Sequence, residues 1–534
     1  MEAASASPFA STSPATGEAL SAVDATPISS IDDVVRRARE AREAWAALSL
    51  ETRIETVGAV KQRILARAEE IAKVVHEETG KPDVEALLGE VLASADVVSY
   101  WSEVLPEELE PVEADIDALS YPSKIGTIHR EARGTLAVIM PWNFPFALPL
   151  RTIVPALMVG NAIVFKPSEI TPRTGKLIVD LFADLLPEGL LALVQGGGEA
   201  GAKLCDADVD LVVFTGSPTT GRKVAHACAE RLVPCALELG GKDAAIVLAD
   251  ADLERAASGI VWGGMMNAGQ NCGAVERVYV EKSVAKAFVE KVIAHTKALR
   301  VGTDVGPLTT AAQRSVVERH VEAARSGGGQ VLAGGEACDE PGAKLGYRPT
   351  VVTIEADANP LVADETFGPV VPIAEIADVE EGIRRANASR YGLTASVWTK
   401  DTVRGEAIAK RLRAGVVTVN NHSFTGAIPS APWSGMGETG WGITGSPLAL
   451  DTLTRPRFLL VDHNRAPREV WWYPYTDTLR KLALAFAAIR GGASSFGARI
   501  GAIFSVLSLM PKRMRELKSG RSASPRAELE KPAK

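Results

Sequence analysis

From near residue 134 onward, short apolar segments alternate regularly with segments of helical periodicity. The apolar segments contain few polar residues, and they are "GTLAVIM", "NAIVFKP", "LALVQGGG", "VDLVVFTGS" and "PCALELGGKDAAIVL". Short apolar runs of this kind are typical of strands buried on both faces, and the helices between them indicate parallel pairing. A similar alternation recurs at residues 271–420. The sequence therefore predicts an α/β fold whose parallel sheets are covered on both faces by helices.

The N-terminal part of the chain has a different pattern. Helical periodicity dominates residues 30–110, and Ser30 precedes "IDDVVRRAREAREAWAAL", whose early acidic residues favour a helix start. Residues 121–134 ("YPSKIGTIHREARG") alternate and end in a turn signal, which predicts a hairpin.

Charge is unevenly distributed along the chain. The net charge of −8 gives no reason to expect a nucleic acid partner. Residues 465–534 hold 14 Lys+Arg and 5 Asp+Glu, a balance of +9, so the remainder of the chain carries −17. The C-terminal region is therefore basic on an otherwise acidic protein.

The cysteines and the N-terminus bear on the compartment. Five cysteines show no CxxC pair and no zinc-like spacing with the histidines, and they are Cys205, Cys228, Cys235, Cys272 and Cys338. An odd, sparse set argues against a disulfide framework and suits a reducing compartment. We find no signal peptide pattern and no apolar run of roughly 18 residues. We therefore expect a cytoplasmic protein without a spanning helix and without a metal site.

Two glycine-rich turns are candidates for binding phosphate. Gly196-x-Gly198-x-x-Gly201 follows an apolar strand and opens a short helix, as in a dinucleotide fingerprint. The next predicted strand ends in a threonine rather than the acidic residue that this fingerprint expects, so a glycine turn required only for packing is an equal alternative. Gly216-Ser217 offers a second helix start where a hydroxyl and main-chain amides could face phosphate oxygens.

Four separated segments require one explanation, and they are "PWNFP" (141–145), "FKPSE" (165–169), "ELGGK" (238–242) and "GQNC" (269–272). Each has a structural interpretation alone, and an isolated cysteine such as Cys272 is most often a small apolar filler. Together with "FTGSPTTGR", "GYRPTVV", "ETFGPVV", "YGLTASVWT" and "GVVTVN", in this order, they resemble the aldehyde dehydrogenase superfamily. The resemblance extends from about residue 14 to about residue 460.

The resemblance implies a catalytic role for three residues. Cys272 would be the nucleophile that attacks the aldehyde carbon and forms a thiohemiacetal and then a thioester. The side-chain amide of Asn143 and the main-chain amide of Cys272 would stabilise the oxyanion. Glu238 would activate the water that hydrolyses the thioester.

The resemblance also implies a nicotinamide cofactor. Lys166 and Glu169 match positions that contact the adenine ribose, and the carboxylate of Glu169 would repel a 2′-phosphate, which favours NAD while leaving NADP open. The remaining implied cofactor-binding residues are Trp142, Gly198, Gly216, Ser217, Leu239, Glu365 and Phe367.

The implied architecture is an aldehyde dehydrogenase-like α/β fold with two doubly wound α/β domains plus an oligomerisation arm. The NAD-binding domain would comprise residues 1–111 and 132–240, and the catalytic domain residues 241–433. The arm would comprise residues 112–131 and 450–461, which suggests a homodimer or homotetramer.

The function that follows is NAD-dependent oxidation of an aldehyde to a carboxylic acid. Alternatives are a succinate-semialdehyde dehydrogenase, a CoA-acylating enzyme, which generally lacks the base at Glu238, and an inactive scaffold, which would be expected to lose Cys272 or Asn143. A carboxylated substrate would need a cationic anchor, for which His422 and Arg277 are close in sequence, although Arg277 better suits a structural pair. An apolar funnel is suggested by Phe146, Trp262, Met265, Met266, Phe424 and Trp433.

The C-terminal extension, residues 462–534, has no counterpart in most family members. Apolar residues at helical spacing form two stripes, Leu479, Leu482, Phe486 and Ile489, and then Ile500, Ile503, Phe504 and Leu507. The extension could pack on a partner subunit or over the substrate entrance. Alternatively, it could lie on the inner membrane surface as an interfacial helix held by anionic lipid. Residues 519–534 are polar and predict disorder.

Overall fold

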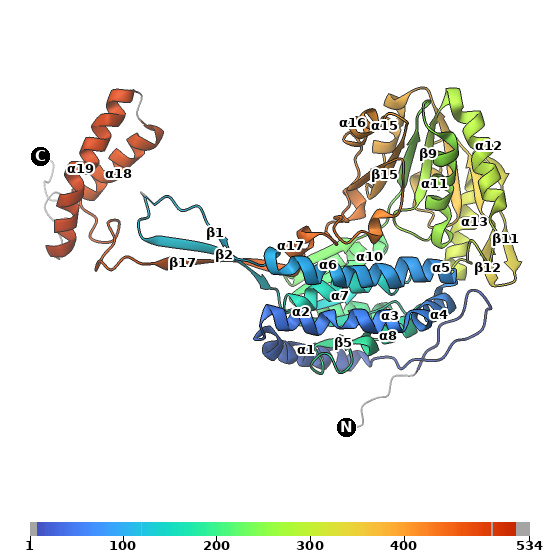
Figure 1. Cartoon of the computed structure of the whole chain (residues 1–534), viewed down its shortest axis with the longest axis horizontal. Coiled ribbons are helices and arrows are strands. Elements are labelled where there is room, and N and C mark those ends of the chain that lie inside the picture. The colour runs from blue at the N-terminus through green and yellow to red at the C-terminus, as the bar shows by residue number, and fades with distance from the viewer. Residues whose placement is uncertain (1–7, 119, 493–494, 520–534) are drawn as a thin grey trace, which may run out of the picture. The chain divides into compact units, whose positions relative to one another are not determined.

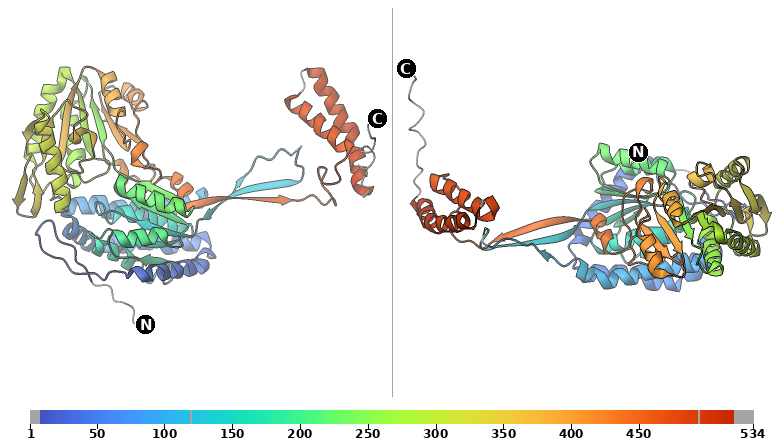
Figure 2. Two further views of the ribbon diagram at one scale, coloured as in Figure 1. Left: turned by 180° about the vertical axis from the view of Figure 1, so that it is seen from behind. Right: turned by 90° about the horizontal axis from the view of Figure 1, so that it is seen from above.

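The computed structural model describes residues 8–118, 120–492 and 495–519. The chain forms two compact units, one of residues 1–112 with 128–457 and the other of residues 113–127 with 458–534 (Figure 1). Of residues 519–534, for which the sequence predicts disorder, Ser519 is the last residue of a helix, and residues 520–534 lie outside the described residues. The larger unit contains one parallel sheet and one sheet that is parallel except at an edge strand, each with its own helices (Figures 1 and 2).

The first sheet has five strands in the order β5-β4-β3-β6-β7, and every pairing is parallel. Its strands are β3 (Thr135–Ile139), β4 (Ala162–Lys166), β5 (Leu191–Leu193), β6 (Leu211–Thr215) and β7 (Cys235–Glu238). Both faces of β3 and β4 are buried, which is why these segments contain almost no polar residues. The predicted alternation of strand and helix is confirmed here.

Helices cover both faces of this sheet. In chain order, β4 and β5 lie successively on one side of β3. The chain then returns past β3, and β6 and β7 lie on its other side. Because such crossovers are right-handed, the helices before and after the return lie on opposite faces. The first pair is α7 (Ala147–Met158) and α8 (Pro172–Phe182), and the second is α9 (Gly198–Asp206) and α10 (Pro218–Glu230). Helix α1 (Ile31–Ala46) packs beside α9, and its start after Ser30 is as predicted.

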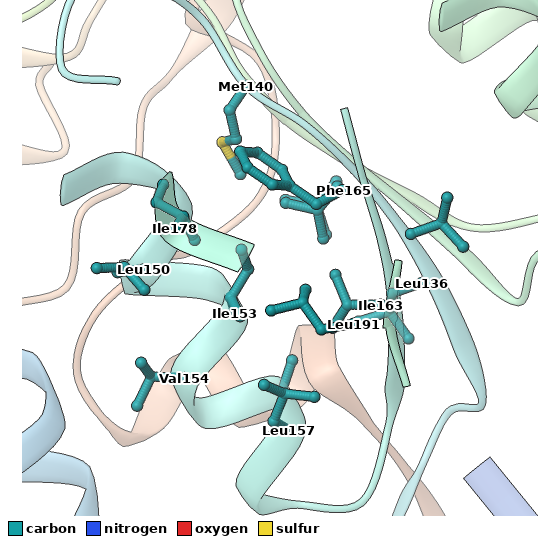
Figure 3. Close-up of a cluster of buried hydrophobic side chains, with 14 of the residues drawn as sticks. Leu136, Met140, Leu150, Ile153, Val154, Leu157, Ile163, Phe165, Ile178 and Leu191 are labelled. Carbon is teal, nitrogen blue, oxygen red and sulfur yellow. The ribbon is translucent and has the colours of Figure 1, made fainter. Parts of the chain in front are cut away.

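The core beneath α7 shows how the first sheet is held together. Ile153 and Leu157 of α7 face Ile163 of β4 and Leu191 of β5 (Figure 3). Ile153, Leu157 and Ile163 are fully buried, and each such side chain contributes about 1.5–3 kcal/mol to folding. This packing fixes the strand ends from which the site residues project.

Further helices lie outside α7 and α8, in contact with them and with one another. They are α2 (Leu50–Gly58), α3 (Val60–Ala66), α4 (Ala68–Thr79), α5 (Asp83–Ala86) and α6 (Ala93–Glu108). The helical periodicity of residues 30–110 therefore corresponds to helices in the structure.

The second sheet has seven strands in the order β10-β13-β14-β9-β8-β15-β16. They are β8 (Asp243–Val247), β9 (Val275–Glu281), β10 (Gln330–Ala333), β13 (Thr350–Thr353), β14 (Val370–Ile376), β15 (Thr394–Trp398) and β16 (Val416–Val419). Only the edge strand β10 runs antiparallel to its neighbour. Since β7 ends at Glu238 and β8 begins at Asp243, the carboxyl end of a strand in the first sheet leads directly to the amino end of one in the second.

The second sheet also has helices and a hairpin packed around it. The helices are α11 (Leu253–Met265), α12 (Lys282–Ala298), α13 (Ala311–Ser326), α14 (Pro360–Ala363), α15 (Val379–Asn387) and α16 (Thr402–Ala409). The hairpin pairs β11 (Ala337–Glu340) with β12 (Ala343–Tyr347). The short helix α17 (Leu450–Leu453) precedes the last strand.

A third sheet has three strands in the order β1-β2-β17, and they are β1 (Val112–Glu113), β2 (Lys124–Ala132) and β17 (Thr454–Asp462). The prediction of a hairpin within residues 121–134 is wrong, because this segment forms the single strand β2. Its alternation correctly indicates a strand, but the turn signal at Arg133-Gly134 leads into β3 of another sheet.

The smaller unit ends in two helices, α18 (Asp477–Ala487) and α19 (Phe496–Ser519). Helices α18 and α19 pack against each other. Within the residues that the structure describes, no helix is long and apolar enough to cross a membrane.

Candidate active site

The predicted site residues lie in the loops that follow the strands of the first sheet. Trp142 and Asn143 follow β3, Lys166 ends β4, Ser217 follows β6 and Glu238 ends β7. In an open parallel sheet, ligands bind at the carboxyl ends of the strands, beside the point where the strand order reverses. That point lies between β3 and β6. The topology therefore brings together residues that are far apart in the sequence.

Cys272 follows a turn of unusual backbone conformation between α11 and β9. Asn267, Ala268 and Gly269 all have positive φ angles, 55°, 53° and 70°. The side chain of Gln270 secures the turn, since its Nε2 donates to the Asn267 carbonyl oxygen at 3.0 Å and its Oε1 accepts from Thr309 N at 2.8 Å. Left-handed backbone at non-glycine residues is strained and often occurs at functional sites. The strain here fixes the loop that carries the thiol.

A cavity of about 290 Å³ opens beside Cys272. Its lining is largely apolar, and the bulky apolar members are Leu88, Val97, Phe144, Leu148, Trp262, Met266, Phe424 and Trp433. These residues come from both sheet-bearing parts of the larger unit, because some precede β3 or lie on α7 and others belong to α11 and the loop after β16. A cavity of this kind can bind an apolar molecule with one end next to the thiol.

The predicted funnel is partly confirmed. Trp262, Met266, Phe424 and Trp433 line the cavity, and Phe146 and Met265 do not. Those two side chains are 0% and 2% exposed and belong to the hydrophobic cores.

Glu238 is a buried carboxylate that does not itself line the cavity but interacts electrostatically with two residues that do, Arg151 and Cys272. Burial raises the pKa of Glu238 to about 7, and the neighbouring Arg151 guanidinium and hydrogen bonds from Thr444 lower it only in part. Its Oε1 has no hydrogen-bond partner among the described residues. A carboxylate that titrates near neutrality, with one oxygen available, suits general base catalysis.

The Cys272 thiol is held in its protonated form at rest. Burial raises the pKa of Cys272, and the carboxylates of Glu238, Asp243 and Glu365 raise it further. The sulfur lies 3.9 Å from Oδ1 of Asn271. Because the thiolate is the nucleophilic form, a reaction at Cys272 needs an acceptor for its proton.

Asn143 is fixed by contacts to its main chain as well as its side chain. Its Nδ2 donates to the Gln270 carbonyl oxygen at 3.2 Å, which joins it to the loop of Cys272. Its own carbonyl oxygen accepts from Lys81 Nζ and from Asn267 Nδ2, both at 2.9 Å. Lys81 in turn pairs with Glu90 in a fully buried ion pair. Asn143 is 4% exposed, and its amide is held in a fixed position close to the nucleophile loop.

Two site residues are not identifiable from the sequence. Glu85, between α4 and α6, lines the cavity, and both its carboxylate oxygens accept from Asn267 N, at 3.2 and 3.0 Å. Arg151 of α7 also lines the cavity and is only 7% exposed. Neither position belongs to a motif, and their side-chain hydrogen bonds are to residues more than a hundred positions away, so no local signal marks them.

Arg277 and His422, the cation and the histidine predicted as possible anchors for a carboxylated substrate, do not line the cavity. Arg277 donates from Nε to the Lys242 carbonyl oxygen at 2.8 Å and from its other nitrogens to main-chain oxygens near α15, a structural role as expected. His422 is 1% exposed and contacts Oγ1 of Thr394 at 3.2 Å. Burial lowers the pKa of His422 to about 4.

The carboxyl end of β4 offers an open site beside the start of α9. Nζ of Lys166 lies 3.9 Å from Oε2 of Glu169, whose side chain is 49% exposed. A β-carbon at Gly197 or at Gly198 would meet no atom of the described residues within 4 Å. A solvent-facing carboxylate beside a glycine-lined helix start fits the ribose and phosphate of a dinucleotide.

Ser217 and Gly216 lie at the N-terminus of α10. Ser217 is the N-cap, and its Oγ accepts from Thr220 N at 3.3 Å. Gly216 N donates to the Glu238 carbonyl oxygen at 3.0 Å, which connects this helix start to β7. Leu239 is 7% exposed and packs toward α10 at Gly221. The amides at the start of α10 can hold phosphate oxygens.

The third cofactor region surrounds Glu365 and Phe367. Oε1 of Glu365 accepts from Gly241 N at 3.0 Å, and burial raises the pKa of Glu365 to about 8. Glu276 accepts from Phe367 N at 2.7 Å and thereby fixes this loop. The ring of Phe367 meets the ring of Trp142 edge to face, with centroids 5.6 Å apart. Trp142, Glu365 and Phe367 therefore lie close to the segments that follow β3 and β7 in the first sheet.

A partly buried thiol that lines a cavity, electrostatically coupled to a carboxylate and located where one sheet leads into another, is the arrangement of a cysteine-dependent α/β enzyme. Residues 1–459 match the aldehyde dehydrogenase family, and the chain belongs to that family. The predicted family is thus confirmed, and with it the class of enzyme, an aldehyde dehydrogenase.

The names of two similar proteins agree with membership of this family. The chain is 34% identical over 475 residues to 4,4′-diapolycopene aldehyde oxidase of Methylomonas sp, with 88% of each chain covered. It is 35% identical over 435 residues to a putative succinate-semialdehyde dehydrogenase [NADP(+)] 2 of Mycobacterium ulcerans (strain Agy99), with 80% of this chain and 83% of that protein covered.

Solved structures confirm the predicted fold class. An NAD+ complex of the aldehyde dehydrogenase from Bacillus cereus superposes with a TM-score of 0.82 at 33% identity. The match covers 86% of this chain and 94% of that chain.

Proposed function

We propose that this protein oxidises an apolar aldehyde to a carboxylic acid with NAD. The observation that carries the proposal is the position of the Cys272 thiol in the wall of an apolar cavity, electrostatically coupled to Glu238 and connected through Gln270 to Asn143. The NAD+ complex of the Bacillus cereus relative supports the choice of cofactor.

The chemistry begins with the thiol. Cys272 transfers its proton to solvent water in the cavity, and its thiolate attacks the aldehyde carbon to form a thiohemiacetal. Asn143 Nδ2 and the main-chain amide of Cys272 donate to the oxyanion that develops on the substrate oxygen. When bound, NAD supplies the acceptor for the hydride that leaves the former aldehyde carbon. Cys272 then carries the acyl group as a thioester.

Hydrolysis of the thioester requires a base. Glu238 takes a proton from water, the resulting hydroxide attacks the acyl carbon, and the Cys272 sulfur leaves as thiolate. The carboxylic acid is released and Cys272 regains a proton. A branch of the family that transfers the acyl group to CoA generally lacks this base, so Glu238 favours hydrolysis.

Cofactor preference follows from Glu169. Its carboxylate can accept from both ribose hydroxyls and would repel a 2′-phosphate, which favours NAD over NADP. Lys166, 3.9 Å away, moderates this preference.

The apolar cavity supports an apolar substrate, of medium chain length or aromatic. The name of the Methylomonas relative, 4,4′-diapolycopene aldehyde oxidase, agrees with this choice. A second candidate is a carboxylated aldehyde such as succinic semialdehyde, as in the name of the Mycobacterium relative. Arg151 favours it, because this guanidinium lines the cavity and its Nε has no hydrogen-bond partner among the described residues. Against it, Nη2 of Arg151 already donates to the Ala431 carbonyl oxygen at 3.2 Å.

A steady-state assay tests the proposal. NADH formation with hexanal, benzaldehyde and succinic semialdehyde gives kcat/KM for each substrate, and we expect the two apolar aldehydes to be preferred. C272S should abolish turnover, and no reaction should require CoA. A higher kcat/KM for succinic semialdehyde that R151L removes would establish the second candidate, and a CoA requirement would exclude the hydrolytic route.

We also propose that the protein forms a homodimer or homotetramer through its arm. Four consecutive apolar residues of β17, Phe458, Leu459, Leu460 and Val461, are between 43% and 54% exposed. Light scattering of the purified chain checks this, and a monomer at micromolar concentration would contradict it.

A further inference from the structure

Helices α18 and α19 bury one side of each helix against the other. Leu482 of α18 is 1% exposed, and Ala502 and Leu517 of α19 are both 8% exposed. The first apolar stripe of the C-terminal extension, which includes Leu482, therefore serves the contact between the two helices.

The second stripe faces solvent. Ile500, Ile503, Phe504 and Leu507 are 39%, 46%, 67% and 65% exposed. At 100° per residue these four side chains share one side of α19, and we name them the α19 apolar face. A contiguous exposed face of large apolar side chains marks an interaction surface, whereas isolated exposed apolar residues do not.

The charge around this face is predominantly positive. Residues 478–519 contain eight lysines and arginines and a single acidic residue, Glu516. Glu516 accepts from the hydroxyls of Thr476 and Thr478, inside the unit. The exposed cations on α19 are Arg499, Lys512, Arg515 and Lys518. On a helical wheel Lys518 continues the side of the α19 apolar face, and Arg499 and Arg515 flank it.

Aromatic side chains are exposed on the turn before α18. Arg513, 0% exposed, organises this turn by donating to the carbonyl oxygens of Val470 at 2.9 Å and Pro474 at 2.8 Å. The aromatic residues Trp472 and Tyr473 are 51% and 72% exposed on it. Tryptophan and tyrosine are enriched where proteins meet the boundary between lipid and water.

We propose that the α19 apolar face and its flanking cations bind the surface of a membrane that contains anionic phospholipid. An amphipathic helix of this composition lies in the interface, with its apolar side among the acyl chains and its cations at the phosphates. Interfacial binding agrees with the absence of a helix, among the described residues, that could span a membrane. A symmetric contact between two α19 faces would bring like charges together, whereas lipid phosphates complement them.

Vesicle flotation of the full chain tests the proposal. We expect the protein to float with vesicles of phosphatidylcholine and phosphatidylglycerol, to float little with phosphatidylcholine alone, and to be released by salt. I503S/F504S/L507S should lower the partition coefficient at least about tenfold, because it removes the buried apolar area. K512Q/R515Q/K518Q should also lower it about tenfold or more.

L232S/V403S is the matched control, because Leu232 and Val403 are 92% and 78% exposed in the larger unit and should not matter. Turnover of a short, water-soluble aldehyde should be the same for all four proteins and shows that each is folded. The proposal is wrong if the wild-type chain stays out of the vesicle fraction, or if the serine variant floats as well as the wild type. It is also wrong if the serine variant changes the oligomeric state by light scattering while vesicle binding persists, since a second copy would then be the partner.

Discussion

Gly241 passes the main-chain carbonyl of Cys272 so closely that a β-carbon at residue 241 would lie 2.5 Å from the Cys272 oxygen. The neighbouring Gly240 is equally restricted, because a β-carbon there would lie 2.3 Å from Oε2 of Glu365. The pair of glycines after β7 thus allows the nucleophile loop and a proposed cofactor residue to approach the strand that ends at Glu238.

Replacing Gly241 with alanine should displace the Cys272 loop. We expect a loss of stability of about 1–3 kcal/mol from the steric clash. We expect a larger effect on kcat, about 100-fold, because a displacement near 1 Å of a reacting group is sufficient for such a loss. Gly501→Ala is the control, since a β-carbon there meets no described atom within 4 Å. Equal kcat values for both variants would contradict the close approach.

The raised pKa of Glu238 predicts how activity depends on pH. A general base must be deprotonated, so kcat should rise as pH increases through about 7 and fall as pH decreases through it, because burial raises the pKa of Glu238 to about 7. Glu238→Gln should lower kcat by about 10²–10⁴-fold and remove this step from the profile. Mass spectrometry after mixing with aldehyde and NAD should then detect the acyl group on Cys272. An unchanged pH profile would argue for another base.

Glu85 should act as a positioning residue for the nucleophile loop. Glu85→Ala removes the two carboxylate oxygens that accept a hydrogen bond from Asn267 N. The positive-φ turn then lacks this support. We expect kcat to decrease about tenfold or more and alkylation of Cys272 by iodoacetamide to change in rate. Glu85→Gln retains an acceptor oxygen and should restore most of kcat. If glutamine and alanine behave alike, the hydrogen bond is not the reason for the loss.

The buried ion pair of Lys81 and Glu90 should dominate local stability. Both side chains are 0% exposed. Lys81→Met leaves a buried carboxylate without its cation, which costs about 3–5 kcal/mol and should lower the thermal unfolding midpoint by several degrees. Lys176 pairs with Asp180 at 2.6 Å on the surface, with side chains 57% and 46% exposed, and serves as control. Lys176→Met should leave the midpoint unchanged.

The alternation of apolar strands and helices predicts both sheets. A strand that is buried on two faces consists almost entirely of apolar residues, which makes it recognisable in the sequence. The convergence of the site could also be anticipated, since residues at the carboxyl ends of parallel strands meet at one edge. The direction in which each side chain points could not be anticipated from the sequence. Phe144 lines the cavity while Phe146, two residues later, is buried in the core, and the geometry at the start of α7 decides between them.

Long-range partners are the other part that the sequence does not reveal. Glu85 meets Asn267 across 182 positions, and no spacing rule connects them. The second apolar stripe of the extension also looks like a core stripe in the sequence. Only the structure shows that α19 uses a different side, near Ala502 and Leu517, to contact α18 and leaves Phe504 exposed.

Glu169→Gln should change the cofactor preference if this carboxylate faces the adenine ribose. The glutamine keeps the size of the side chain and removes the charge that would repel a 2′-phosphate, while Lys166 remains 3.9 Å from that position. One unit charge a few ångströms from a phosphate in a partly exposed site corresponds to about a tenfold change in relative affinity. We therefore expect the ratio of kcat/KM for NAD to that for NADP to fall about tenfold. Glu199→Gln, on the first turn of α9, is the comparison. If both substitutions shift the ratio equally, the preference reflects the general charge of this edge, and Glu169 has no specific role in reading the ribose.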